Sequence, residues 1–184
     1  MEELNRVRKA VILTALASKL REHGSWCGET HMQKSTYLLQ DLLEVPMGFD
    51  FILYMYGPFS FDLRSELTAL RADGLLDLEA KPPYGPQFSP TKQSDLLREH
   101  FPKTMGTYKN RMDFVAKTFG NKKVGELERL ATAVYLIKES NISSEEKQAK
   151  LMRIWKPHIS ENEARQALEQ AKQIVKEAQD IVNG

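Results

Sequence analysis

The sequence has little of several features that would identify a class of protein at once. Its single cysteine, Cys27, excludes a disulfide framework and is typical of a reducing compartment. No apolar run approaches the roughly 20 residues of a membrane-spanning helix. The first residues lack the small-residue cleavage site of a signal peptide. We therefore expect a cytoplasmic protein that neither spans nor contacts a membrane.

Catalytic and ligand-binding motifs are also missing. There is no glycine-rich phosphate loop and no nucleophile elbow, and the four histidines are dispersed. Cys27 and His31 lie four residues apart, which supplies only two of the four ligands of a structural zinc site. We therefore expect no catalytic residue, metal or cofactor and hence no enzyme. An enzyme that uses Cys27 or His31 stays open as a minor alternative, which requires a pocket around them.

The net charge of +1, from 26 Lys and Arg against 25 Asp and Glu, conceals an uneven distribution. Residues 1–90 carry a net charge of −3, residues 91–123 carry +5 and residues 124–184 carry −1. The overall balance excludes a basic protein that coats nucleic acid. The middle segment is the single basic region.

Local signals in the first hundred residues predict a mixed order of elements. We expect a helix from Leu4 to about Leu20, a second from Glu29 to Leu43, a strand at 51–56, a turn at 57–60 and a helix at 61–73 capped by Ser60. A strand at 75–79, a Pro- and Gly-rich loop and a short strand at 87–89 precede a helix from Thr91, in which Leu96 and Leu97 face inward. This is the order of a winged helix-turn-helix, with residues 80–87 as the wing. The predicted fold is therefore mainly α (α+β), with a winged-helix-like core at 1–100.

Residues 101–184 form a predicted helical extension on this core, within one globular unit. Helices are expected at 107–119, 124–139, 145–155 and 161–182, with a break at 141–145, and Ser160 and Glu163 have the spacing of a capping box. The last helix has a seam of small and apolar residues at heptad spacing: Ala164, Leu168, Ala171, Val175, Ala178 and Val182. We favour docking of this seam on residues 124–155, and a homodimer through it is the alternative.

Nucleic-acid binding is possible but disfavoured by the charges. The third helix of a winged helix-turn-helix enters the major groove, where Arg and Lys make most contacts. Here that helix carries Arg64 and Arg71 against three acidic residues, and the wing offers only Lys81. Phosphate contacts would have to come from residues 91–123, outside the usual contact surface of the motif.

Two motifs in the first sixty residues resemble a prokaryotic family. Residues 29–39, ETHMQKSTYLL, resemble its T-x-x-Q-K-x-x-Y-L-L segment, and Tyr56-Gly57-Pro58-Phe59-Ser60 resembles its Y-G-P-[FY]-S turn. These are the YwgA-like proteins, which look related to the Panacea domain of SocA-like antitoxins. Phe88-Ser89-Pro90-Thr91 stands where the family has a strand that leads into an LT-x-x-G helix start, although the glycine is missing. Residues 127–132 and Lys156-Pro157-His158 are similar to its C-terminal segments.

The resemblance implies a winged-helix-like core without enzyme activity that binds a protein, such as a toxin encoded nearby. Candidate partner-binding residues are Gln33, Lys34, Tyr37, Tyr56, Pro58, Ser60 and Tyr84. Each also has a plain structural interpretation: Lys34 solvated or paired with Glu29, the tyrosines half-buried, Gly57-Pro58 a turn. Exposed aromatic residues around Tyr54, Tyr84 and Phe88 are the natural contact points. We expect a protein-binding module of antitoxin type, with a winged-helix DNA-binding regulator as the alternative.

Overall fold

The first helices follow the local signals closely. The computed structural model describes residues 3–139 and 144–184. Helix α1 (Arg6–Glu22) begins after Asn5, whose side chain accepts a hydrogen bond from Arg8 N, and it ends before Gly24 with φ +85°. Helix α2 (Glu29–Tyr37) continues into the π-helical turn η1 (Leu38–Leu42), as the predicted helix 29–43 requires. Val7 lies on α1 with an exposed side chain.

The next segment contains a hairpin that the sequence analysis described only in part. Strand β1 (Ile52–Tyr54) is shorter than the predicted strand 51–56, and Gly57–Phe59 is a second strand, β2, where a turn was predicted. The two pair antiparallel, with Ile52 opposite Phe59 and Tyr54 opposite Gly57. A proline can stand in β2 because a strand at the edge of a sheet need not donate from every backbone nitrogen. The chain turns at Met55 and Tyr56 instead.

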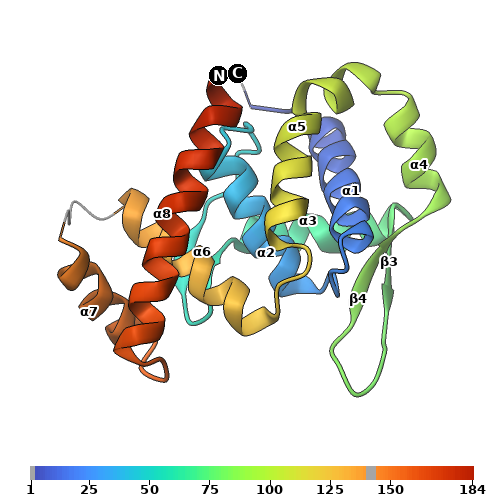
Figure 1. The fold of residues 1–184 in the computed structure, drawn as a ribbon. Helices are drawn as coiled ribbons and strands as arrows, with labels where there is room; N and C mark the ends of the chain where they lie inside the picture. Colours follow the sequence, from blue (N-terminus) through green and yellow to red (C-terminus); the bar gives the residue numbers. More distant parts are fainter. Residues whose placement is uncertain (1–2, 140–143) are drawn as a thin grey trace.

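Helix α3 (Phe61–Ala72) and the β3–β4 hairpin complete the first hundred residues. The side chain of Ser60 caps α3 by accepting from Leu63 N, as predicted. Strands β3 (Leu76–Glu79) and β4 (Gln87–Pro90) pair antiparallel, and their connecting loop extends away from the helices (Figure 1). Thr91 caps α4 (Lys92–Glu99). The prediction that Leu96 faces inward was wrong, because Ser94 takes the buried position and Leu96 is exposed.

Four helices form the remainder of the described chain. Helix α5 (Pro102–Phe119) begins five residues earlier than predicted, with a proline in its first turn. Helices α6 (Val124–Glu139), α7 (Glu145–Trp155) and α8 (Glu161–Asn183) match the predicted ranges. The predicted break at 141–145 lies largely outside the described residues. The structure is mainly helical with two small antiparallel hairpins. Within the described ranges, no helix is long and apolar enough to cross a membrane.

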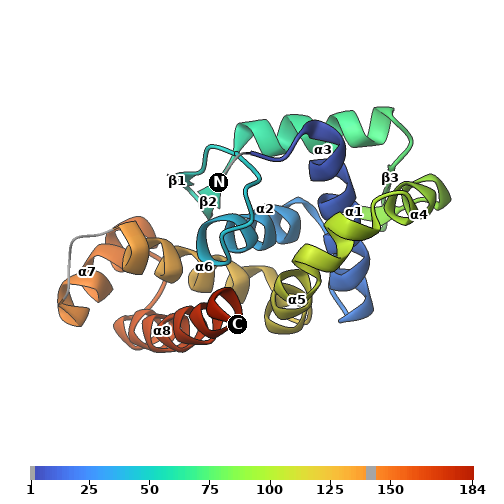
Figure 2. The ribbon, with the colours of Figure 1, turned by 90° about the horizontal axis from the view of Figure 1, so that it is seen from above.

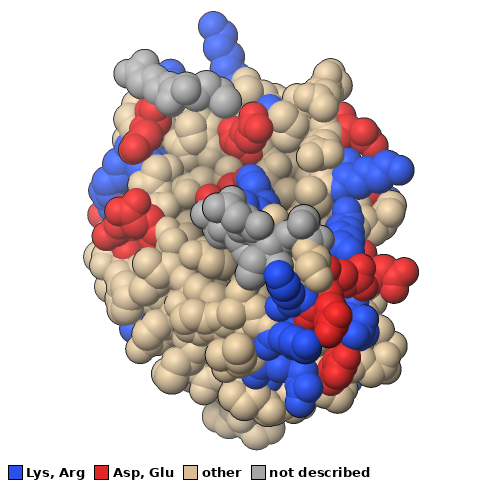
Figure 3. All heavy atoms as spheres, turned by 90° about the vertical axis from the view of Figure 1, so that its left-hand side faces the viewer, with Lys and Arg blue, Asp and Glu red and all other residues tan. Residues whose placement is uncertain are grey.

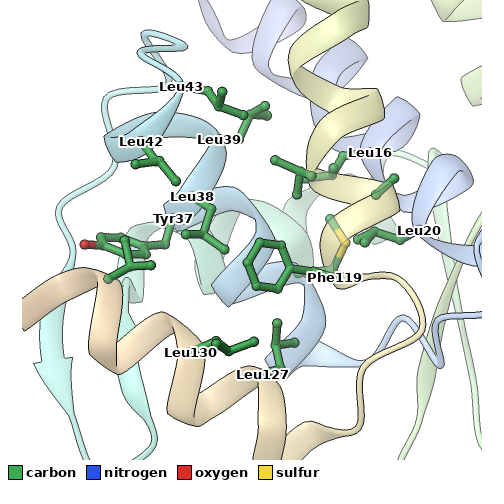
Figure 4. Close-up of a cluster of buried hydrophobic side chains, with 14 of the residues drawn as sticks. Leu16, Leu20, Tyr37, Leu38, Leu39, Leu42, Leu43, Phe119, Leu127 and Leu130 are labelled. Atoms are coloured by element: carbon green, nitrogen blue, oxygen red, sulfur yellow. The ribbon is translucent and has the colours of Figure 1, made fainter. Parts of the chain in front are cut away.

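A continuous apolar core joins the two predicted parts of the chain. It includes buried residues from Ala10 in α1 to Ala178 in α8, and α1 packs against α5 while α2 packs against α6. Figure 4 shows the ring of Phe119 among leucines of α1, of residues 38–43 at η1, and of α6. Side chains from both parts therefore share one core, and neither part buries its apolar face alone.

The seam of α8 is covered by the chain itself. Helix α8 packs along α6 and α7 (Figure 1), and Ala164, Leu168, Ala171 and Ala178 are fully buried. Val175 and Val182 are partly buried against the same core. The seam residues are thus buried within the chain, as the docking interpretation predicts. A homodimer through α8 would have to use another face of the helix.

Replacing Ser160 by alanine is expected to reduce the free energy of unfolding by about 1 kcal/mol. Ser160 accepts a hydrogen bond from Glu163 N, and the Glu163 side chain accepts one from Ser160 N, so the predicted capping box is present. Urea denaturation checks the loss. Ser144, at the N-cap of α7, makes no side-chain capping bond, so Ser144→Ala is the matched control and leaves stability nearly unchanged. Equal losses in both variants would contradict a role of the capping box.

Candidate functional site

The β1–β2 hairpin is held in place by two neighbouring polar residues of α2 that are almost fully buried. The Gln33 side chain exchanges two hydrogen bonds with the backbone of Ser60: Nε2 donates to the carbonyl oxygen at 2.9 Å, and Oε1 accepts from the backbone nitrogen at 2.9 Å. Lys34 Nζ donates to the carbonyl oxygen of Pro58 at 2.9 Å. Because a buried backbone group without a partner is costly, these side chains determine where β2 can lie.

A second buried lysine holds the tip of the hairpin. Lys156 follows α7 and is 1% exposed. Its Nζ donates to the carbonyl oxygen of Met55 at 3.0 Å and lies 5.6 Å from the centre of the Tyr56 ring. The hairpin is therefore attached to α2 at one strand and to the C-terminal half of the chain at its turn.

Helix α6 also packs against the hairpin, in addition to α2 and Lys156. A Cβ added at Gly57 would lie 2.7 Å from Thr132 Oγ1 and 3.4 Å from the carbonyl oxygen of Glu128. Gly57 also has φ +92°, a conformation that side chains disfavour. Glycine at this position thus meets two requirements at once, close approach to α6 and a left-handed backbone.

Burial changes the protonation of the charged groups beneath the hairpin. Burial lowers the pKa of Lys34 to about 8, although Glu128 opposes this shift, and burial also lowers the pKa of Lys156. Burial raises the pKa of the Glu128 carboxyl, against the opposing effects of Lys156 and Lys34. The carboxylate therefore offsets part of the cost of two lysines in a poorly solvated place.

The outer surface of the hairpin is apolar and aromatic. We call Ile52, Tyr54, Met55, Tyr56 and Phe61 the aromatic face. Their side chains are between 44% and 62% exposed. Tyr54 and Phe61 each contact the half-buried ring of Phe59, with ring centres 5.9 and 5.0 Å apart. Figure 3 looks onto the side of the molecule that carries α7 and this hairpin, and a broad area of it has no charged side chains.

The structure separates the predicted partner-binding residues into two groups. Five are buried: Gln33, Lys34, Tyr37, Pro58 and Ser60. These five lie beneath the molecular surface and could contact a partner only indirectly. Tyr56 and Tyr84 are exposed at 57% and 70%. They lie far apart, because β1–β2 and β3–β4 stand at opposite ends of α3 (Figure 2). Tyr56 alone of the seven belongs to the aromatic face.

Several expectations about single side chains were wrong. Lys34 is neither solvated nor paired with Glu29, because its ammonium group donates to Pro58. Tyr37 is buried and packs edge-on against Phe51, with ring centres 5.3 Å apart. Phe88 was expected as an exposed contact, but it is buried in the core. In each case tertiary packing buries a side chain for which the local sequence gives no sign of burial.

Two residues of this site were not among the predicted ones. Lys156 was noted only within its Lys-Pro-His motif, and Glu128 only within residues 127–132. The available signal for Lys156 was local: it is a charged residue in a motif that also contains a helix-ending proline. No signal in the sequence indicates that Lys156 lies next to Met55, 101 positions away.

Cys27 has no properties of an active nucleophile. Its side chain is buried beside Met32 Sδ at 3.7 Å, and burial raises the pKa of the thiol to about 12. The thiol is therefore protonated near neutral pH, and the thiolate is the reactive form. His31 is also buried, and its Nε2 lies 3.1 Å from the carbonyl oxygen of Lys122.

Comparisons with known proteins add no assignment. The resemblance to YwgA-like and Panacea-domain proteins thus stays a prediction from the motifs of residues 29–39 and 56–60. No protein-family model matches this chain, and no curated protein sequence matches it significantly.

Proposed function

We propose that this protein is a non-enzymatic protein-binding module that captures a partner through the aromatic face. The observation that carries the proposal is the combination of exposed aromatic side chains with a buried polar support. Exposed aromatic clusters are typical of protein interfaces, where Tyr and Trp supply much of the binding energy. Gln33, Lys34 and Lys156 fix the backbone of the hairpin, so little conformational entropy is lost on binding.

The family resemblance supports a more specific form of the same proposal. The motifs that resemble the Panacea family are those that build the support: Gln33 and Lys34 belong to one motif, and Pro58 and Ser60 to the other. In this interpretation the core is a winged helix-turn-helix of α1–α3 and β3–β4. The partner is a toxin-like protein encoded nearby, which the module neutralises or escorts.

Replacing two residues of the aromatic face is expected to weaken partner binding at least tenfold. Tyr56→Ala and Phe61→Ala each remove an exposed ring of the face, and truncation of an interface hot spot costs about 2 kcal/mol or more. The measurement is co-expression with the product of the adjacent gene, followed by size-exclusion chromatography and titration calorimetry.

The matched control is Leu96→Ala, because Leu96 is 57% exposed on α4 and lies outside the aromatic face. It should leave the complex intact. If the adjacent gene products form no complex and show no toxicity that this chain relieves, the antitoxin form of the proposal is wrong. A complex that survives both aromatic substitutions would contradict the assigned surface.

A winged-helix DNA-binding regulator is the second candidate. The exposed side of α3 and the protruding β3–β4 hairpin favour it, since these elements contact DNA in that motif. The charges oppose it: Arg64 pairs with Glu29 at 3.0 Å, and Lys81 pairs with Glu79 at 3.2 Å. The basic segment 91–123 is also partly neutralised from outside, because Lys122 pairs with Glu126 at 2.5 Å.

Binding to a duplex of the gene's own promoter tests this candidate. A regulator that makes six to ten phosphate contacts loses about 10³-fold or more in affinity between roughly 50 and 200 mM salt. Arg71→Ala, on the exposed side of α3, should then weaken binding. Weak binding of equal strength to unrelated DNA would contradict a regulatory role.

A further inference from the structure

A second candidate site lies beside α3. A half-open cavity of about 940 Å³ is lined by the start of α2, by α3, by the β3–β4 hairpin and by residues 121–124. No residue of β1 or β2 lines it. Its size is in the range of small-molecule sites, which span about 300 to 1,000 Å³.

One part of the cavity is apolar and aromatic. Leu67, Leu78 and Phe88 contribute aliphatic and aromatic surface. Trp26 and Tyr84 meet edge to face, with ring centres 5.2 Å apart and an angle of 62° between the planes. Trp26 Nε1 donates to the carbonyl oxygen of Gly85 at 2.9 Å, which ties the loop to this wall. Each of the two rings has a face on which a planar ring can stack.

Positively charged side chains also line the cavity. Four cationic side chains line it, Arg64, Arg71, Lys122 and Lys123, against the single carboxylate of Glu29. Arg64 pairs with Glu29, and Lys122 pairs with Glu126. Arg71 and Lys123 have no acidic side chain within ion-pair distance in the described part of the chain, so their charges are available to an anion.

The backbone at the start of α2 adds to this arrangement, and a buried imidazole lies beside it. The N-terminal end of α2 opens on the cavity at Gly28–Thr30, and Gly28 provides no side-chain cap, so the first N–H groups favour an anion there. His31 is 3% exposed and also lines the cavity. Its Nε2 contacts a carbonyl oxygen, and its Nδ1 has no hydrogen-bond partner among the residues described. The Nδ1 atom is itself buried, so the imidazole is not one of the groups that would hold the ligand.

We propose that this cavity binds a mononucleotide, with the base against Trp26 and Tyr84 and the phosphate near Arg71, Lys123 and the start of α2. A ligand of this chemistry matches both halves of the cavity. A purely apolar ligand would leave the cationic side chains unused, and inorganic phosphate would leave the aromatic wall unused. The proposal is independent of partner binding at the aromatic face.

Tryptophan fluorescence provides a direct test on the full chain. The sequence has two tryptophans, Trp26 and Trp155, so the Trp155→Phe variant reports on Trp26 alone. Titration with AMP and with GMP should give saturable quenching. Arg71→Ala and Tyr84→Ala should each weaken binding about tenfold, as the loss of a charge-assisted hydrogen bond or of a stacked ring does. Both residues are exposed, so the folded chain tolerates both substitutions.

Arg153→Ala is the matched control, because Arg153 is an exposed arginine on α7 outside the cavity. It should leave the titration unchanged. The proposal is overturned if neither nucleotide quenches at about 1 mM, a concentration that detects even weak sites. It is also overturned if inorganic phosphate or adenosine alone binds as tightly as AMP, or if a single-stranded oligonucleotide binds much more tightly in an Arg71-dependent way.

Discussion

Replacing Gly57 by alanine is expected to lower the free energy of unfolding by about 2 to 6 kcal/mol. Two costs add up to this value. A left-handed backbone at a residue that has a side chain costs about 1 to 3 kcal/mol, and overpacking against α6 costs about as much. The new methyl group would lie 2.7 Å from Thr132 Oγ1 and 3.4 Å from the backbone of α6, and the backbone cannot move aside easily. Chemical denaturation followed by circular dichroism measures the loss.

Two other glycines separate the causes. Gly24 has φ +85° with no atom within 4 Å of an added Cβ, so Gly24→Ala reports the backbone cost alone. Gly85, in the β3–β4 loop, has an open environment and no positive φ, so Gly85→Ala should be nearly neutral. A loss at Gly57 no larger than the loss at Gly24 would show that β2 does not pack against α6 as described. The same variant should weaken partner binding, because the hairpin carries the aromatic face.

Lys34 is expected to make the stability of the protein rise between pH 8 and pH 10.5. Burial lowers its pKa from 10.5 to about 8 in the folded chain. In this window the unfolded chain still binds a proton at Lys34 and the folded chain does not, so the free energy of unfolding increases with pH. Relative to Lys34→Met, the wild-type protein should gain about 3 kcal/mol across the window, since one pKa unit corresponds to 1.36 kcal/mol.

Glu128, Lys156 and Glu29 are the charged groups that act on Lys34, and all remain in the variant. Denaturation curves at pH 7, 8, 9 and 10 for both proteins therefore isolate the effect of this lysine. Lys117→Met is the control, because Lys117 is exposed on α5 and is solvated in the folded and unfolded states. A difference between wild type and Lys34→Met that is constant with pH would contradict the burial of the ammonium group.

Most elements of this fold could be predicted because their signals are local. Ser60, Thr91 and Ser160 each precede a helix and cap it, and Gly24 ends α1 in a left-handed conformation. These interactions join residues only a few positions apart. The β2 strand could not be predicted in this way, because Gly57-Pro58 has the local pattern of a turn and becomes a strand only by pairing with β1 between α2 and α6.

The candidate sites depend much more on tertiary packing. Tyr56 was identified from its motif, yet its neighbour in space, Lys156, lies a hundred positions away. The cavity beside α3 gathers residues from α2, α3, the β3–β4 hairpin and the segment after α5, so no single stretch of sequence contains its pattern.

The sequence by itself determined the helical periodicities, the caps, the single cysteine and the uneven charge, since each depends on residue type and short spacing. Tertiary structure decided which polar side chains are buried. A solvated side chain was one interpretation of Lys34, but the folded chain buries both Lys34 and Lys156, because the carbonyl oxygens of Pro58 and Met55 and the Glu128 carboxylate are brought to them. Burial and long-range contact are properties of the whole chain, and they convert two ordinary lysines into the support of the aromatic face.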